Sequence, residues 1–270
     1  MTSISYRSPL FNGRRQVLHW ALGIAAAALS PTMATAQAWQ QVDAIRSSVG
    51  DASVSTSALQ LTLPLVAEDG SSVPLTIAAP AAQGDARITR LEIFAPGNPT
   101  PQVATFDFGE EITQIDLSTR IRLSESQTVV VVAHTAGGTV QIAERPVRVT
   151  TSGCIAPAQS DPANEMQARV RVPKTWKAGA PGEVLTMISH PMTTGLQKDP
   201  QGNTPPTRII ESFTASIDGR QVVSARFFRS LAANPYLKFN MAPAQAGDLR
   251  VVWTEDTGRV VEHSERLNLG

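Results

Sequence analysis

The chain contains one cysteine, Cys154, in the stretch VRVTTSGCIAP, where a predicted strand runs into small residues. A cysteine thiolate can act as a nucleophile, bind a metal or carry a covalently attached group. Since there is no second cysteine, an internal disulfide is excluded. Three roles remain: a buried small hydrophobic residue, an intermolecular disulfide and a working thiol. The position of Cys154 in a connector, away from the apolar face of any strand, favours the working thiol.

No residue next to Cys154 in the sequence could activate it as a nucleophile. The candidates that could approach it only in space are His134, Lys174, His190 and arginines of the C-terminal half. The chain also has no CxxC, HExxH, phosphate-loop or dinucleotide-binding motif. The sequence therefore predicts no catalytic residue, no metal and no cofactor, and it indicates a carrier of a thiol-bound group rather than an enzyme.

The first 38 residues are typical of an export signal. Arg14 and Arg15 precede an apolar run at 20–29, and a small-residue A-x-A site follows at 34–36. The apolar run is too short to cross a bilayer. We therefore expect residues 1–38 to be a twin-arginine-type signal peptide and the mature protein to be periplasmic, without a membrane span.

The charge balance bears on the class of partner. The chain has 23 Lys and Arg residues and 23 Asp and Glu residues, and no basic run follows the signal. A nucleic-acid partner is therefore not expected.

Most of the sequence after the signal has the two-residue period of β-strands. One short amphipathic helix is predicted from Val42, Ile45 and Val49, and Leu59, Leu61, Leu63 and Leu65 are expected on one face of a strand. Short strands separated by Gly, Pro, Asn and Asp turns are typical of antiparallel sandwiches. Further strands are predicted at 73–80, 88–94, 103–108, 115–123, 129–133, 139–143 and 147–150.

A second sandwich is predicted after a connector rich in small and polar residues. Alternation resumes near 168, and hairpin turns are predicted at Asp218-Gly219 and at 255–258. The predicted fold is therefore all-β, with two immunoglobulin-like antiparallel β-sandwich domains joined by a short linker after an N-terminal signal peptide. The predicted boundaries are 39–154 for the first domain, 155–167 for the linker and 168–270 for the second domain.

Two segments of the second half are candidates for contact with a partner. The long polar loop ISHPMTTGLQKDPQGNTPPTR carries His190 and Arg208, and long loops in compact domains often carry function. The segment AANPYLKF carries Asn234 and Tyr236. The alternatives are that His190 only ends a strand and that Tyr236 packs at a sandwich edge. Trp176 and Trp253 are predicted packing residues.

These stretches resemble a known family. From about 168 to 269, VPKTWKAGAPGEVLTMISHPMTTGLQKD, PPTRIIESFTASIDGRQVVSARF, AANPYLKF and GDLRVVWTEDTGRVVEHSERLNL resemble SoxZ of the periplasmic thiosulfate-oxidation carrier. From about 42 to 154, the strand pattern and the final VRVTTSGC resemble its partner SoxY. The whole chain therefore resembles a fused SoxYZ-type sulfur carrier, of the kind associated with quinoprotein dehydrogenases.

The resemblance implies that Cys154 is the covalent attachment point for sulfur-compound intermediates and that Gly153 gives the carrier arm flexibility. It also implies pairing of the two domains within the chain. The implied partners are periplasmic sulfur-oxidising enzymes or a quinoprotein dehydrogenase. One departure from the family is that its cysteine lies near a free C-terminus, whereas here the chain continues through Ile155. An arm tied at both ends swings less than a free one.

An alternative function belongs to another class. The chain could be a noncatalytic accessory or binding module for a periplasmic quinoprotein dehydrogenase, with the thiol of Cys154 incidental or used for dimerisation. Partner binding that survives Cys154→Ser would favour this alternative.

Overall fold

Alternating apolar residues form strands through almost all of the chain that the structure describes. The structure is a computed structural model, and it describes residues 38–55, 57–153, 162–198 and 201–270. Except for Ala38, the predicted signal peptide lies outside the described residues, as does Cys154. The all-β, antiparallel prediction is confirmed, because nearly every sheet pairing is antiparallel and α1 (Asp43–Val49) is the single α-helix of the described ranges.

We call residues 38–153 the N-terminal half and residues 162–270 the C-terminal half. The strands of the N-terminal half are β1 (Val54–Ser55), β2 (Gln60–Thr62), β3 (Val66–Asp69), β4 (Val73–Ala79), β5 (Ile88–Phe94), β6 (Gln102–Phe108), β7 (Ile115–Ile121), β8 (Gln127–Thr135) and β9 (Val140–Thr151). Those of the C-terminal half are β10 (Ala168–Arg171), β11 (Gly182–Ile188), β12 (Ile210–Ile217), β13 (Arg220–Phe227), β14 (Tyr236–Met241), β15 (Gly247–Glu255) and β16 (Val260–Leu267). Three short 3₁₀ helices complete the described elements: Ala38–Gln41, Gly84–Ala86 and Pro162–Asn164.

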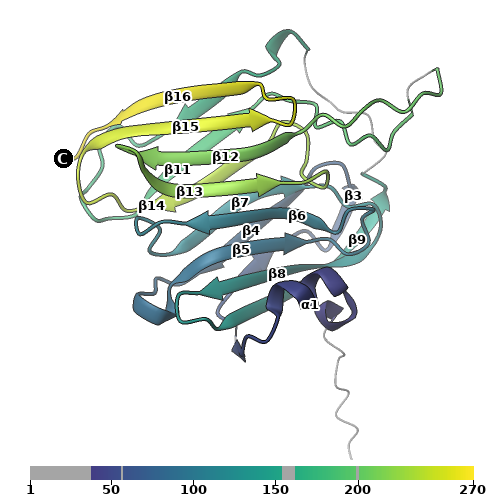
Figure 1. The fold of residues 1–270 in the computed structure, drawn as a ribbon, viewed down its shortest axis with the longest axis horizontal. Coiled ribbons are helices and arrows are strands. Elements are labelled where there is room, and N and C mark those ends of the chain that lie inside the picture. Colours follow the sequence, from purple (N-terminus) through teal and green to yellow (C-terminus); the bar gives the residue numbers. More distant parts are fainter. Residues whose placement is uncertain (1–37, 56, 154–161, 199–200) are drawn as a thin grey trace, which may run out of the picture. The chain divides into compact units, whose positions relative to one another are not determined.

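The two halves share both of their sheets. The larger sheet has the order β1-β9-β8-β5-β6-β13-β12-β15-β16, with β3 also paired to β9, and the smaller has the order β10-β11-β14-β7-β4-β2. Figure 1 shows the larger sheet as a continuous stack from β16 to β8, with the smaller sheet behind it. The sequence predicted paired sandwiches, but it did not predict that each sheet would run from one half into the other.

The halves meet in the larger sheet at β6 and β13. Five residue pairs join these strands, from Val223 opposite Phe108 to Phe227 opposite Ala104. Beneath this ladder, the rings of Phe106 and Phe227 pack edge to face at 6.1 Å. Because both rings are buried, one hydrophobic core continues from one half into the other.

In the smaller sheet, the halves meet at β7 and β14 with a sparser ladder. One residue pair, Ser118 opposite Lys238, joins the two strands. Beyond it, an isolated bridge connects Ile121 to Leu231. The side chain of Asn98, which is buried, adds a hydrogen bond to Ser230 at 3.0 Å.

Two details of the predicted strands were wrong. The strands expected at 139–143 and 147–150 are one continuous strand, β9, which contains Pro146. On the side away from β8, β9 pairs with β1 at 140–141 and with β3 at 148–151. Pro146 lies between these two pairings, so its missing N–H donor is tolerated there.

The other wrong detail is the predicted four-leucine face. Leu59 and Leu63 are buried, but Leu65 is 67% exposed. Pro64 ends the alternation just before Leu65, and the next strand, β3, pairs with β9 instead of continuing β2. The alternation of buried and exposed leucines therefore ends where the chain leaves one strand and pairs with a different neighbour.

The predicted helix and the predicted turns are confirmed. In α1, Ile45 and Val49 are buried and pack on the outer face of the larger sheet against β8. Asp218 and Gly219 both have positive φ, 48° and 83°, as a type I′ hairpin turn requires. The second turn, at 255–258, joins β15 to β16.

The two predicted packing tryptophans, Trp176 and Trp253, are both buried. In the described ranges, no helix is long and apolar enough to cross a membrane.

An arginine-lined cavity beside Gly153 as the candidate functional site

The last described residue before Cys154 is packed tightly against a second glycine. The N–H of Gly153 donates to the carbonyl of Leu123 at 2.9 Å, and the N–H of Gly70 donates to the carbonyl of Thr151 at 2.9 Å. A Cβ on Gly153 would overlap the carbonyl of Gly70, and a Cβ on Gly70 would overlap the carbonyl of Leu123. Glycine is therefore needed at both positions for close backbone approach.

The backbone carbonyl of Gly153 is hydrogen bonded to a buried arginine. Arg122, only 2% exposed, donates from Nη1 to the carbonyl oxygen of Gly153 at 3.2 Å. Its Nη2 donates to the carbonyls of Pro191 and Met192 at 3.3 and 3.2 Å, and its Nε donates to that of Leu231 at 3.2 Å. One guanidinium therefore joins the exit of β9 to two segments of the C-terminal half.

These bonds fix the place from which the chain continues to Cys154. The carbonyl that accepts from Arg122 belongs to the peptide bond between Gly153 and Cys154, and successive Cα atoms are about 3.8 Å apart. These four hydrogen bonds of Arg122 end on backbone carbonyls, and one of them places its guanidinium beside the last described residue before Cys154.

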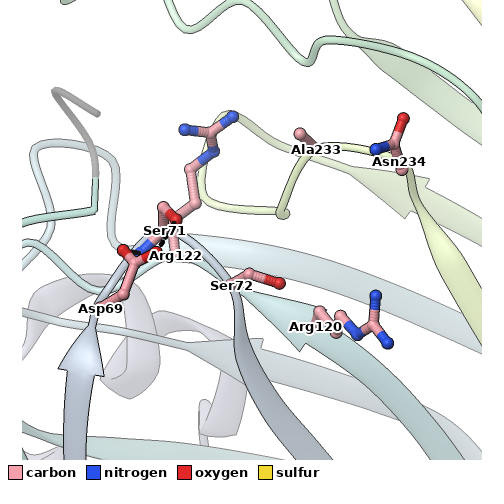
Figure 2. Close-up of a pocket in the computed structure, with 7 residues that line it drawn as sticks. All are labelled: Asp69, Ser71, Ser72, Arg120, Arg122, Ala233 and Asn234. Carbon is pink, nitrogen blue, oxygen red and sulfur yellow. Dashed lines mark hydrogen bonds between the residues drawn. The ribbon is translucent and has the colours of Figure 1, made fainter. Parts of the chain in front are cut away.

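A cavity of about 200 Å³ opens at this point. Figure 2 shows its lining side chains around an open space, with Ser72 between the two arginines. The turn between β3 and β4 and the end of β7 supply one side, and the loop before β14 supplies the other. The lining residues are Asp69, Ser71, Ser72, Arg120, Arg122, Ala233 and Asn234.

Asp69 is the one carboxylate among the lining residues. Its Oδ1 accepts from the N–H of Ser71 at 2.8 Å and its Oδ2 accepts from the Ser71 hydroxyl at 2.7 Å. These two hydrogen bonds, with a smaller contribution from the nearby charge of Arg122, hold the pKa of Asp69 below its ordinary value. Asp69 is therefore ionised at neutral pH, with both oxygens engaged in its own turn.

The second arginine, Arg120, is exposed at the other side of the cavity. Its guanidinium carbon lies 5.3 Å from the centre of the Tyr236 ring, within the range of a cation–π contact. Among the described residues it forms no salt bridge. Its charge is thus available to a ligand in the cavity.

The structure gives Gly153 a role that differs from the predicted one. Gly153 is buried, and both of its backbone polar groups are hydrogen bonded, so it is the anchored end of the segment and not its hinge. The predicted flexibility can apply only to residues after it. Cys154 itself lies outside the described residues, so its role as attachment point stays a prediction.

The prediction that His190 faces a partner was wrong, because its side chain is 0% exposed. Its Nδ1 accepts from the N–H of Met192 at 3.0 Å, and its Nε2 lies 2.9 Å from Oε1 of Glu255, which it reaches as the donor. Burial lowers the pKa of His190, and the carboxylate of Glu255 opposes that shift only in part. His190 shapes the turn whose carbonyls, at 191 and 192, accept from Arg122.

The other three candidate partner-facing residues are partly exposed. Arg208 is paired within the chain, with Glu165 at 2.9 Å and Glu255 at 3.9 Å. Asn234 lines the cavity and Tyr236 lies beneath Arg120. Contact of these residues with a partner stays a prediction. The structure places Asn234 in the cavity lining and Tyr236 against Arg120, whereas Arg208 is not part of the lining.

Sequence reasoning missed the five polar residues of the N-terminal half that line the cavity: Asp69, Ser71, Ser72, Arg120 and Arg122. Arg120 lies in β7 and Arg122 directly follows it. Since odd positions of β7 such as Ile121 face the core, the alternation places both arginines toward solvent. Arg122 is buried because the C-terminal half covers it, and no local signal could have shown that. Within the described ranges, no group of three or more His, Cys, Asp or Glu residues is placed to hold a metal ion.

Comparison with known families covers most of the chain. Residues 45–154 match the family described as sulfur oxidation protein SoxY, and residues 170–266 match the family described as sulphur oxidation protein SoxZ. The chain is a fused SoxY–SoxZ protein. The N-terminal half is its SoxY half and the C-terminal half is its SoxZ half. The interface between the halves, formed at β6 and β13 and at β7 and β14, is therefore a contact between two family domains. The arginine-lined cavity lies at this interface.

Among curated proteins, no relative matches the chain. Solved structures similar to it include the superoxide reductase (neelaredoxin) from Ignicoccus hospitalis, at 16% identity and a TM-score of 0.29, over 38% of this chain and 80% of that one. They also include a β-glycosidase from Bacteroides vulgatus at 13% identity and a TM-score of 0.24, over 83% of this chain and 26% of that one. Similarity at this level carries no functional argument.

Proposed function

We propose that this protein is a periplasmic covalent carrier, which holds sulfur-compound intermediates on Cys154 and presents them to sulfur-oxidising partner enzymes. The observation that carries the proposal is where the SoxY match ends. It stops at 154, the position of the only cysteine of the chain. The family is one of sulfur oxidation, and a single thiol at the end of its domain is suited to carry a group.

The geometry around Gly153 supports a carrier in physical terms. A carried group must be offered from a defined place, and Arg122 and Gly70 fix the start of the Cys154 segment against the fold. The partners then supply the chemistry, and the carrier itself needs no acid or base. We include a quinoprotein dehydrogenase among the partner classes, beside sulfur-oxidising enzymes.

Intact mass measurement of the protein exported by its native host tests the proposal. We expect a mass increase during growth on a reduced sulfur compound that a thiol reductant removes and that Cys154→Ser abolishes. Ser152→Ala, two residues earlier, is the matched control and should keep the increase. A chain that stays unmodified, or forms only a disulfide dimer, during sulfur-compound turnover would show that it is not a carrier.

A further inference from the structure

The outer face of the smaller sheet, on the side away from the core, carries positive charge on its edge strand β10. Arg169 and Arg171 are exposed, and they alternate with Ala168 and Val170, which pack against the core. Because successive side chains of a strand point to opposite faces, both arginines point outward. Their two charges therefore lie side by side at the edge of this sheet.

The register of the sheet extends this face across three more strands. Arg169 is opposite Met187 on β11, and Met187 is opposite Tyr236 on β14. Both of these apolar side chains are partly exposed. The ring of Tyr236 then lies 5.3 Å from the guanidinium carbon of Arg120, which is exposed on β7. One row of side chains thus runs from the SoxZ half into the SoxY half.

The next row along the strands separates balanced charges from unbalanced ones. Arg171 is opposite Leu185, which is partly exposed, and Leu185 is opposite Lys238. The ammonium of Lys238 lies 3.5 Å from a carboxylate oxygen of Glu183 and 3.9 Å from one of Asp116. The two carboxylates of this row therefore balance the lysine and not the arginine.

We call the exposed arginines and the apolar side chains between them the basic face: Arg120, Arg169, Arg171, Leu185, Met187 and Tyr236. Among the described residues, none of its three arginines forms a salt bridge. Arginine, tyrosine and methionine are enriched at protein–protein interfaces, and arginine and tyrosine are among the residues whose loss weakens binding most. The basic face therefore has the composition of a surface that binds a protein, and its charge complements acidic side chains.

Protection of the sheet edge explains only part of this surface. Charged side chains on an edge strand such as β10 oppose pairing with other chains. Arg120, however, lies on β7, which has β14 on one side and β4 on the other. Its charge has no edge to protect, so edge protection does not account for the basic face as a whole.

We propose that the basic face is the docking surface for an acidic surface of a partner enzyme. This proposal rests on the proposed function, which requires partners, and it adds where on the carrier they bind. Because Arg120 also lines the cavity at the interface between the halves, a partner docked on the basic face adjoins that cavity. Since both halves contribute side chains, the complete face exists only when the halves are paired.

Photo-cross-linking in the native host identifies the occupant. The photoreactive residue p-benzoylphenylalanine replaces Leu185, within the basic face, or Val252 as the matched control. Val252 is also partly exposed on an interior strand, β15, but of the larger sheet. Mass spectrometry then identifies the joined protein and peptide.

We expect the probe at 185 to join a second protein through a peptide rich in Asp and Glu, and the probe at 252 not to join that protein. The proposal would be overturned by cross-links only to another copy of this chain, by cross-links only to lipid, or by the same cross-links from both positions. It would also be overturned if the probe at 185 joined no protein.

The second test uses the captured protein, purified, as the probe in calorimetric titrations of the full chain. We expect the affinity of the wild-type chain to fall as NaCl is added, and that of Arg169→Glu with Arg171→Glu to be at least about tenfold weaker at low ionic strength. If this double variant does not fold, Arg171→Gln alone should weaken binding by about threefold.

Arg148→Glu with Arg226→Glu is the matched control for this titration. These two arginines are exposed on strands of the larger sheet, and their replacement changes the net charge by the same amount. The control should keep most of the affinity. Equal losses in the two double variants would show that binding follows net charge and not the basic face.

The two proposals fail in distinguishable ways. The mass experiment in the native host decides whether Cys154 carries sulfur compounds. The cross-linking and the titrations can be repeated with Cys154→Ser, so they report on the basic face even if the host never loads Cys154.

Discussion

The two places where the SoxY and SoxZ halves meet are built differently. In the larger sheet, β6 and β13 are joined by five residue pairs above a core of aromatic rings. In the smaller sheet, β7 and β14 share one pair, and the contact then passes to Arg122 and a cavity. The first junction is closed by a longer backbone ladder and apolar packing. The second has a shorter ladder and adds side-chain hydrogen bonds, those of Arg122 and Asn98 among them.

The two junctions therefore have different roles: the larger-sheet junction stabilises the pairing of the halves, and the smaller-sheet junction contains the cavity. Burial of aromatic surface stabilises the pairing of the halves without any polar site, so the smaller-sheet junction is free to keep a charged, water-accessible cavity. A cavity is costly where the core is tightly packed and tolerable where the neighbouring junction holds the halves together. Gly153, the last described residue before Cys154, is hydrogen bonded to Arg122 at the second junction.

The most damaging change should be in the larger-sheet junction. Phe106→Ala removes a fully buried ring that contacts Phe227, and we expect the free energy of unfolding to fall by about 3–5 kcal/mol. Urea denaturation measures this loss. Val260→Ala, at a side chain that is 51% exposed, should change it by less than about 0.5 kcal/mol. Similar losses in the two variants would contradict the central role given to this junction.

Loss of the buried arginine should weaken the other junction. Arg122→Met keeps much of the side-chain volume but leaves four carbonyls without their donor. We expect a loss of about 2 kcal/mol in unfolding free energy, because the cavity lets water reach part of the site. We also expect faster alkylation of Cys154, since its segment loses an anchor. An unchanged alkylation rate would show that Arg122 does not hold the segment.

A single methyl group tests the glycine contact. Gly153→Ala places a Cβ against the carbonyl of Gly70, so the backbone must shift, and we expect a loss of about 1–2 kcal/mol. Ser152→Ala is the control with no such overlap. Thermal unfolding of both variants makes the comparison, and equal midpoints would mean that the two glycines are not in close contact.

The smallest expected effect is a dependence on pH. The pKa of His190 is lowered in the folded protein, so between that value and the ordinary value of about 6.5 the unfolded chain binds a proton that the folded chain does not. The free energy of unfolding should therefore fall as pH drops below about 6.5, by at most about 1.4 kcal/mol per unit. Urea denaturation between about pH 7.5 and about pH 5 measures it.

His190→Gln should flatten this dependence, even though the variant is less stable at every pH. His263→Gln, on the edge strand β16, is the control and should keep the slope of the wild-type protein. A slope that survives in His190→Gln would assign the effect to other groups.

Local patterns predicted the elements of the fold well. Turns such as Asp218-Gly219 depend on the φ preferences of their own residues, and the core faces of α1 and β4 follow from periodicity. The patterns failed where a distant partner decides the outcome. Leu65 continues the alternation of leucines but is exposed. Strand β9 continues through Pro146 because β1 and β3 pair with it on either side of that residue.

The site was much less predictable than the fold. The sequence and its family resemblance pointed to Cys154, but Arg122 carries no local sign of burial and His190 was placed on the surface. The burial of Arg122 depends on how the SoxZ half covers the end of β7, which is a property of the paired halves. His190 is held by Glu255, Met192 and Asn234, which lie elsewhere in its own half. In both cases contacts with distant segments decide the burial, and local sequence patterns do not show such contacts.

The shared larger sheet also has a consequence for how the chain avoids aggregation. If only one half were folded, β6 or β13 would be a bare edge strand, with a row of unpaired N–H and C=O groups open to other molecules. Pairing these strands within one chain covers both edges at once. The ladder between β6 and β13 thus protects a molecule from edge-to-edge association only when both of its halves have folded.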